Sequence, residues 1–206
     1  MIEFLVGSSL AASAGLNAWM PLFLLGLSDR LLPAVVLPAG WSWLSSDIAL
    51  WVLGGLLVLE IIADKIPALD SINDVVQSVL RPASGGIAFG AGASAQTIAV
   101  EDPSVFFSER TWIPILSGVV IALIVHATKA TARIAANTMT GGLAAPLLST
   151  AEDGASFALA ALAIVVPIIA ALLLVGLVVL VVLFFRRRRR RKQAQVVSGA
   201  PAAPVA

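Results

Sequence analysis

EIIADKIPALDSINDVVQSVLRP, residues 60–82, gathers many of the ionisable side chains of an otherwise apolar chain. Glu60 and Asp64 stand four residues apart at the end of an apolar run, which places both carboxylates on one face of a helix, and Lys65 follows directly. Pro67 is expected to end that helix. The sequence therefore predicts a helix that delivers two acids and a base to its far end.

A short amphipathic helix is predicted to follow, with Asp70 as its N-cap and Pro82 as its end. One side of this helix is apolar, and the other carries Asp70, Asp74 and Arg81. The hairpin is either an elbow at a membrane interface or part of a buried polar site. We prefer a solvated, interfacial face for these three residues, and the sequence leaves the role of the preceding acids open.

The composition places the chain among helical membrane proteins. It has 206 residues, of which 59% are hydrophobic and 12% charged, and its mean hydropathy is +1.00. Several uncharged runs reach the roughly 20 residues that a helix needs to cross the hydrocarbon core. We therefore predict an all-α, polytopic transmembrane helical bundle. The chain has no cysteine, which excludes disulfides, thiolate metal sites and cysteine nucleophiles.

About five crossings are expected, within a transmembrane domain that covers residues 1–185. The first is interpreted as a retained helix rather than a signal peptide, because the start MIEF carries no basic residue, and its Asn17 needs a hydrogen-bond partner. TMTGGLAAPLLSTAEDG, residues 138–154, predicts an irregular or re-entrant segment. The last apolar run is expected to tilt, to kink at Pro167 or to lie partly in the interface. Residues 83–100 are either a crossing or a broken segment, and we prefer a crossing. The predicted crossings are residues 4–27, 48–64, 83–100, 111–137 and 155–185.

The end of the chain carries a run of like charge, RRRRRRK, at Arg186–Lys192. Seven of the 13 basic residues lie there, which leaves six against 12 acidic residues elsewhere. A basic run directly after an apolar helix indicates a multi-pass protein of the plasma (inner) membrane whose C-terminus is cytoplasmic and contacts anionic lipid. Residues 186–206 are expected to form a disordered tail. A nucleic-acid partner is not expected, because no folded module or interleaved aromatic residues accompany the run.

A second polar stripe lies on one face of the predicted helix 111–137. His126, Lys129, Arg133 and Asn137 follow one another there at steps of three, four and four residues. They either pair with the acids across the bundle or mark where the helix leaves the membrane, and we prefer the latter. Five crossings with a cytoplasmic C-terminus also create a conflict with the positive-inside rule, because they place four basic residues on the outer side: Lys65, Arg81, Lys129 and Arg133.

Two segments carry a resemblance to a known family. They are ADKIPALDSINDVVQSVLRPASGG, residues 63–86, and VHATKATARIAANTMTGGLAAPLLSTAEDG, residues 125–154. Together with AASAGLNAWMPLFLLGL, residues 11–27, they resemble a bacterial membrane family catalogued as domain of unknown function 4126, over about residues 4–180. The resemblance implies a membrane location but no catalytic or binding residues. Ala145 departs from it, because an Asn is expected before Pro146, and this weakens a ligand role at that turn.

The polar residues favour a small transporter or channel-like protein for a cation or proton. In this hypothesis Glu60 and Asp64 form a central polar site with Lys129 and Arg133, and the glycine-rich segments 83–94 and 139–146 supply backbone groups. The alternative is a non-transporting membrane scaffold or regulatory module, in which the charges clamp helices together and the basic tail binds lipid or a partner. The full set of candidate site residues is Glu60, Asp64, Lys65, Asp70, Asp74, Arg81, His126, Lys129, Arg133 and Asn137.

Enzymatic and metal-dependent functions have little support in the sequence. An enzyme that acts on lipid is the weakest hypothesis, because no Gly-x-Ser-x-Gly turn or other catalytic set is present. One histidine without a His-x-x-x-His or Glu-x-x-His spacing does not predict a metal site. We therefore expect no catalytic residues, no cofactor and no metal, and the sequence leaves a homo-oligomer open.

Overall fold

The computed structural model describes residues 1–101, 103, 112–140, 145–176, 178, 179, 183 and 186; for residues 67–72, 74, 137 and 139 it describes the backbone only. The regular elements in this part of the chain are helices, with two isolated β-bridges, so the predicted all-α class is confirmed. The helices are α1 (Ile2–Leu16), α2 (Met20–Leu31), the 3-10 helix η1 (Ser42–Ser45), α3 (Asp47–Ala63), α4 (Pro67–Ser94), α6 (Trp112–Thr140), α7 (Ala145–Val165) and a helix at Pro167–Gly176.

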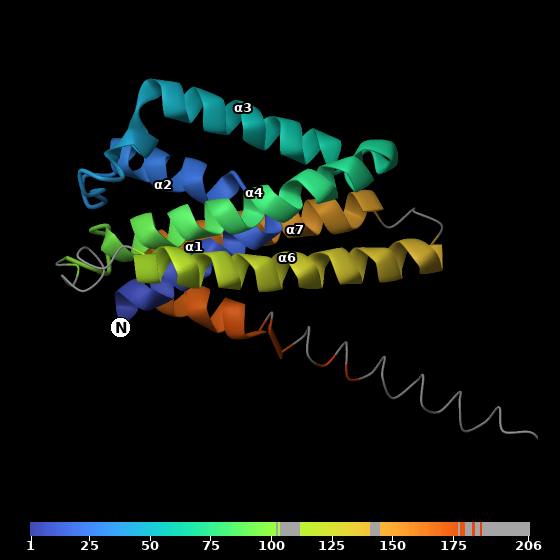
Figure 1. The fold of residues 1–206 in the computed structure, drawn as a ribbon. Helices are drawn as coiled ribbons and strands as arrows, with labels where there is room; N and C mark the ends of the chain where they lie inside the picture. The colour runs from blue at the N-terminus through green and yellow to red at the C-terminus, as the bar shows by residue number, and fades with distance from the viewer. Residues whose placement is uncertain are drawn as a thin grey trace, which may run out of the picture.

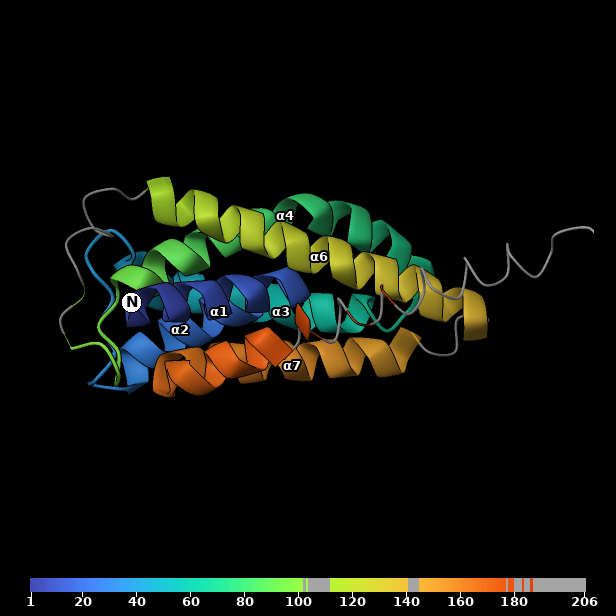
Figure 2. The same cartoon turned by 90° about the horizontal axis from the view of Figure 1, so that it is seen from below.

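The helices form an elongated bundle around α1 (Figures 1 and 2). Helix α1 packs against α4, α6 and α7, and every residue from Val6 to Leu16 is buried. The bundle has an N-terminal end, where Met1 lies and the loops after α2 and α4 meet in the bridge Val36–Gln96. At the opposite end α3 turns into α4, and we call this the α3–α4 end.

Residues 4–27 do not form the single crossing helix that the sequence predicts. Helix α1 ends at Leu16, Asn17 is extended, and α2 returns toward the N-terminal end, so the two helices form a hairpin whose turn lies inside the bundle (Figures 1 and 2). The Asn17 Oδ1 accepts hydrogen bonds from the amides of Trp19, at 3.2 Å, and Met20, at 3.1 Å. Because Pro21 suits the first turn of a helix and Asn17 caps it, a new helix begins here.

Helix α4 is one continuous helix, which corrects the prediction of a short hairpin helix followed by a separate crossing at residues 83–100. It begins after Ile66 rather than at an N-cap Asp70, and it continues through Pro82. Val75 and Val79 are each 72% exposed, whereas Arg81 is fully buried. The orientation predicted for Arg81 was therefore wrong, since Arg81 faces the interior while Val75 and Val79 face outward; the side chains of Asp70 and Asp74 lie outside those described.

The glycines of α4 allow close packing against α6. A Cβ atom at Gly85 would collide with the carbonyl oxygen of Gly118, and one at Gly118 with the carbonyl oxygen of Gly85. This contact explains why Pro82 does not end the helix, because tertiary packing stabilises the segment that follows it. It also corrects the prediction that segment 83–94 supplies backbone groups to a polar site.

The C-terminal helices differ from the prediction in two ways. Helix α7 is regular from Ala145 onward, so residues 145–154 are helical and not part of an irregular or re-entrant segment, and residues 141–144 lie outside the described residues. The run 155–185 is not one kinked helix, because the chain reverses at Val166 and the helix Pro167–Gly176 returns along α7 (Figure 2). Leu159 and Leu174 accordingly pack in the same apolar cluster. A break at Pro167 was expected, but a reversal was not.

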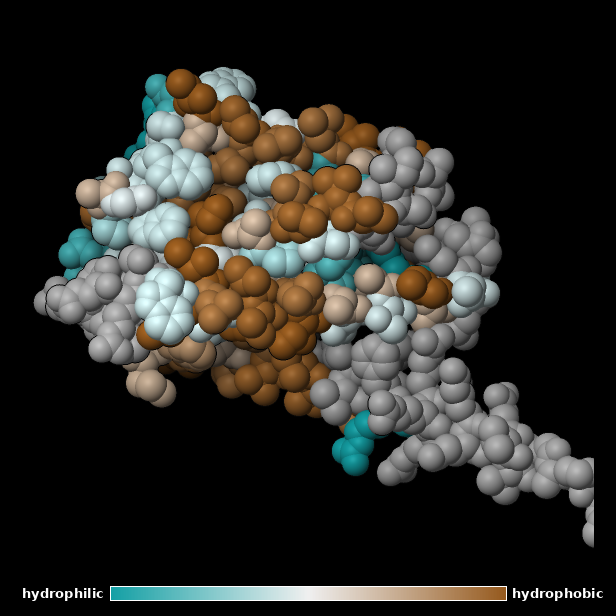
Figure 3. All heavy atoms as spheres, viewed as in Figure 1, coloured by the Kyte–Doolittle hydropathy of each residue, from teal (hydrophilic) through white to brown (hydrophobic). Residues whose placement is uncertain are grey.

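The outer surface of the bundle is apolar to an extent that is unusual for a soluble monomer. On the face shown in Figure 3, hydrophobic side chains cover most of the middle of the bundle. Two helices, Trp112–Ala136 and Ala145–Val165, are long and apolar enough to cross a membrane by length and composition. The large exposed side chains on α3 include Ile48, Trp51, Val52, Val58, Leu59 and Ile62.

Candidate functional site

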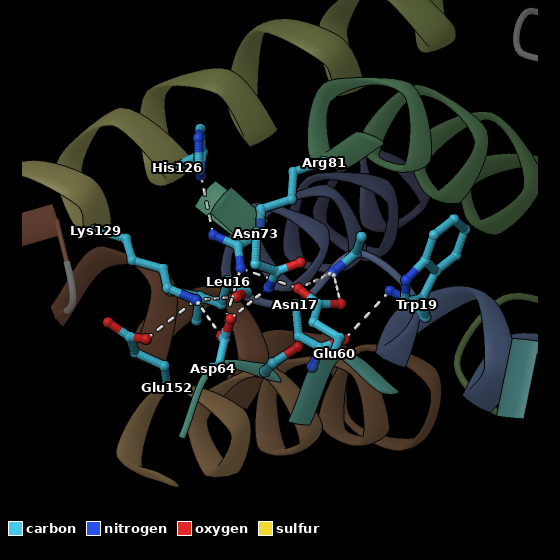
Figure 4. A network of polar contacts seen from close by, with 12 residues as sticks. Leu16, Asn17, Trp19, Glu60, Asp64, Asn73, Arg81, His126, Lys129 and Glu152 are labelled. Carbon is cyan, nitrogen blue, oxygen red and sulfur yellow. Dashed lines mark hydrogen bonds and ion pairs between the residues drawn. The ribbon is translucent and has the colours of Figure 1, made fainter. Parts of the chain in front are cut away.

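Six charged side chains meet inside the bundle, beside the turn between α1 and α2 (Figure 4). Five are almost completely buried, and the side chain of Glu152 is 15% exposed. We call them the charge cluster: Glu60 and Asp64 from the end of α3, Arg81 from α4, Lys129 and Arg133 from α6, and Glu152 from α7. The cluster thus joins four segments that are far apart in the sequence.

Asp64 is the hub of the charge cluster. Its Oδ2 lies 3.3 Å from the Lys129 Nζ, 3.5 Å from the Arg133 Nη2 and 3.7 Å from the Arg81 Nη2. Its Oδ1 accepts a hydrogen bond of 2.6 Å from the Asn73 amide. One carboxylate therefore faces three cations, from both α4 and α6.

The other two acids complete the cluster on either side. Glu60 accepts a hydrogen bond of 2.9 Å from the Arg81 guanidinium. The Glu152 Oε2 lies 3.0 Å from both the Lys129 Nζ and the Arg133 Nη2. Each cation is thus shared between two acids, and the cluster holds α3, α4, α6 and α7 together.

Both ends of the broken helix take part in this arrangement. The Lys129 Nζ donates a hydrogen bond of 2.8 Å to the Leu16 carbonyl at the end of α1, and the Ala18 amide donates one of 3.1 Å to Glu60. A helix end leaves such peptide groups without intrahelical partners and carries a partial charge. The base contacts the negative end and the acid contacts the positive end, so both helix termini are matched in charge.

His126 extends the cluster without adding charge. Its Nδ1 lies 3.0 Å from the Arg81 Nη1, and its Nε2 lies 3.3 Å from the Ser78 Oγ. Because a guanidinium only donates hydrogen bonds, Nδ1 is the acceptor and the proton of a neutral imidazole sits on Nε2. The three acids and three bases of the cluster then balance, and its formal charge is zero.

A peripheral ion pair lies beside the cluster at the α3–α4 end. The Lys65 Nζ is 3.3 Å from the Asp153 Oδ2, and the side chains are 38% and 12% exposed. The other oxygen of Asp153 accepts a hydrogen bond of 3.1 Å from Asn17. This chain of contacts links the buried turn to partly exposed groups, so the cluster is closest to solvent at the α3–α4 end.

The segments that build the cluster lie within a match to a known family. A family model described as Domain of unknown function (DUF4126) matches residues 4–187. The chain belongs to this family. Comparison with curated proteins and with solved structures found no match. The DUF4126 match spans all six members of the charge cluster.

In this DUF4126 chain the structure brings together six of the predicted site residues: Glu60, Asp64, Arg81, His126, Lys129 and Arg133. Lys65 lies at the periphery, and the side chains of Asp70, Asp74 and Asn137 lie outside those described. One preferred interpretation is wrong, because Arg81 is not on a solvated face. For the basic stripe of α6, the structure shows the pairing across the bundle that the sequence left open, since His126, Lys129 and Arg133 are buried among polar partners.

Four polar residues of the site were missed as site residues: Asn17, Asn73, Glu152 and Asp153. Glu152 and Asp153 were assigned to the irregular segment 138–154, whereas they lie on the regular helix α7. Asn17 followed by Pro21 is a helix-start signal that could have located the break. Among the side chains that the structure describes, no group of three or more His, Asp or Glu is placed to hold a metal ion.

Proposed function

We propose that the protein is an integral membrane transporter that moves protons by way of the charge cluster. The observation that carries this proposal is the contact between a broken helix and a neutral, buried set of acids and bases. Transporters commonly build midplane sites from discontinuous helices whose free peptide groups face the substrate or the coupling ion. Here the free groups are the Leu16 carbonyl and the Ala18 amide, and both contact the cluster.

A purely structural role explains the cluster less well. An ionisable side chain at membrane depth costs about 2.5–3.5 kcal/mol on insertion scales, and such groups usually mark pathways for ions or substrates. Replacing buried ion pairs by apolar residues is often neutral or stabilising. Holding helices together with six buried charges therefore costs more free energy than apolar packing would. A function that needs these charges explains the cluster better.

The shortage of free oxygen ligands in the cluster favours a proton over a metal cation. A metal ion would need oxygen ligands that now bind Arg81, Lys129 and Arg133. A proton needs no additional space, because it joins a carboxylate oxygen. Protonation of Asp64 would remove the attraction to all three cations at once and loosen α6 from α3, which gives the transporter a means of switching between states.

The fold also suggests a membrane topology that removes the conflict with the positive-inside rule. If the α1–α2 hairpin enters and leaves on one side, the five crossings are α3, α4, α6, α7 and the helix that begins at Pro167. The α3–α4 end is then cytoplasmic, together with Lys65 and the run Arg186–Lys192. The N-terminal end, with Glu3, Asp29 and Asp47, faces outward. In the plasma membrane the basic run would meet anionic lipid.

This topology predicts which side of the membrane each end faces. Because the chain has no native cysteine, single cysteines can report it. Ser42 lies in the loop region of the N-terminal end, Thr138 lies near the end of α6, and both are exposed. A membrane-impermeant maleimide should label Ser42→Cys in intact cells, but Thr138→Cys only after permeabilisation. The reverse pattern would contradict the topology, and equal labelling of both would contradict a single orientation.

The transport proposal is tested by proton flux into liposomes that contain the purified protein. An imposed pH gradient, with potassium and valinomycin to compensate charge, should produce flux above that of empty liposomes, read from an enclosed pH indicator. Under sodium or potassium gradients without a pH gradient, neither metal ion should cross the membrane faster than in empty liposomes. If only a metal ion crosses, the transported species is that cation and not a proton. If nothing crosses under any gradient, transport is refuted.

A further inference from the structure

A line of buried hydroxyl groups leads away from the charge cluster along α1. Ser9, Ser13 and Asn17 follow one another at steps of four residues, and all three are fully buried. This spacing places them on one face of the helix. The line begins at the turn beside the cluster and ends at Ser9 in the middle of α1, so it runs toward the N-terminal end and away from the partly exposed pair Lys65–Asp153.

Helix α7 supplies the facing groups over the first part of this line. Asn17 donates to Asp153 at 3.1 Å, and one turn further on, the Ser13 and Ser156 hydroxyls lie 2.8 Å apart. Each of these serines also donates to the backbone carbonyl of the other, at 2.8 Å and 3.0 Å. The antiparallel pair α1–α7 therefore carries polar contacts outward from the cluster.

Ser9 continues the line but has no hydrogen-bond partner among the residues that the structure describes. The facing part of α7 is apolar there, since Ala160 and Ala163 are fully buried. A buried hydroxyl without a partner is uncommon and points to a bound water molecule or ion. Successive members of the line are about 6 Å apart along the helix, which is the span that one bridging water closes with two hydrogen bonds.

The outer end of the line approaches an open cavity. A cavity of about 410 Å³ at the N-terminal end is lined by Met1, Ile2, Glu3, Ala99, Val100 and Glu101. Glu3 precedes Ser9 by six residues, or about 9 Å along the axis of α1. The distance between the cavity and Ser9 is thus that of a file of a few hydrogen-bonded water molecules.

We propose that Ser9, Ser13 and Ser156 bind water and form the proton path between the charge cluster and the N-terminal end of the protein. The identity of the moving species rests on the proposed function, whereas the water-filled path is a property of the fold that can be tested separately. The partly exposed acids Glu152 and Asp153 give the cluster its access at the α3–α4 end. The serine line supplies the access on the other side.

Cysteine reactivity tests the path without any assay of transport. Ser9→Cys and Ser13→Cys change one atom each, and Ala11→Cys is a matched control, because Ala11 is equally buried in α1 but packs against Phe89 and Ala93. With the small water-soluble reagent methanethiosulfonate ethylammonium, both serine variants should react on the order of tenfold faster than Ala11→Cys, which reacts only after local opening. Ser42→Cys gives the rate of an exposed thiol.

The outcomes separate the path from the transport proposal. Equal rates for Ser9→Cys, Ser13→Cys and Ala11→Cys, in variants that elute and melt like the wild type, would overturn the path whatever the flux assay shows. Fast labelling together with absent flux would support the water path and refute proton transport. A second measurement uses Ser13→Ala, which removes the hydroxyl that bonds to Ser156 and should therefore lower the melting temperature as well as the proton flux. Unchanged flux would also overturn the path.

Discussion

Proton flux through Asp64→Asn should fall to the level of empty liposomes, and the variant should also melt at a lower temperature. The substitution removes the carboxylate charge that faces Lys129, Arg133 and Arg81, each within 4 Å. Breaking a buried ion pair by removing one partner costs about 3–5 kcal/mol, because the remaining charges stay buried. For a chain of this length that corresponds to a decrease in melting temperature of roughly 6–20 °C. Flux is read in liposomes and melting in detergent.

A loss of flux in a destabilised protein does not by itself show that Asp64 lies on the proton path. A second substitution that restores the charge balance of the cluster, and with it the stability, separates the two effects. Asp64→Asn combined with Arg133→Met removes one acid and one base and leaves the cluster neutral. We expect this double variant to regain most of the lost stability, with a favourable coupling energy of about 1–3 kcal/mol between the two changes. It should still lack flux, because no titratable group remains at the hub.

This double-mutant cycle separates transport from a structural clamp. If Asp64→Asn retains wild-type flux, the hub is not on the path and the proposed mechanism is wrong. If stability follows charge balance and the wild type shows no flux, the scaffold alternative explains the cluster. Flux that returns in the neutral double variant would show that the acid holds the fold and does not carry the proton.

The helix patterns explain which parts of the site were predictable. The spacings of Glu60 with Asp64, and of His126, Lys129 and Arg133, place charges on single helix faces, and the structure brings both sets together. Spacing alone does not reveal whether such a face points inward. In a soluble protein the apolar side of α4 would be buried, but here Val75 and Val79 are exposed and Arg81 is inside. An apolar environment, which the proposed membrane location would supply, inverts the usual rule.

The breaks in the chain were harder to predict than the helices. Two prolines affect the helices differently. Helix α4 continues through Pro82, whereas the chain reverses next to Pro167. Contacts distant in sequence decide between them, such as the close approach of Gly85 and Gly118. At Asn17 the local signal was present, but the apolar run around it favoured one long helix. A short stretch of sequence does not reveal such long-range contacts.

Arg81→Met is expected to destabilise the protein as strongly as Asp64→Asn. Arg81 is completely buried and contacts Glu60, Asp64 and His126, so its removal leaves two acids short of a counter-charge. A cost of about 3–5 kcal/mol follows, with a fall in melting temperature of roughly 6–20 °C in detergent. The combination Arg81→Met with Glu60→Gln should recover much of this loss, because it restores the balance of charge.

Arg30→Met is the matched control for this prediction. Arg30 forms an ion pair with Asp47 at the N-terminal end, where the side chains are 47% and 74% exposed. Exposed pairs of this kind contribute about 0–1 kcal/mol, so the control should melt within a few degrees of the wild type. The two substitutions delete the same side chain and differ in burial and partners. If Arg81→Met melts as high as Arg30→Met, the charge at position 81 is hydrated rather than buried. The cluster would then be an open, aqueous site with water available as a ligand, and the argument that favours a proton over a metal cation would no longer apply.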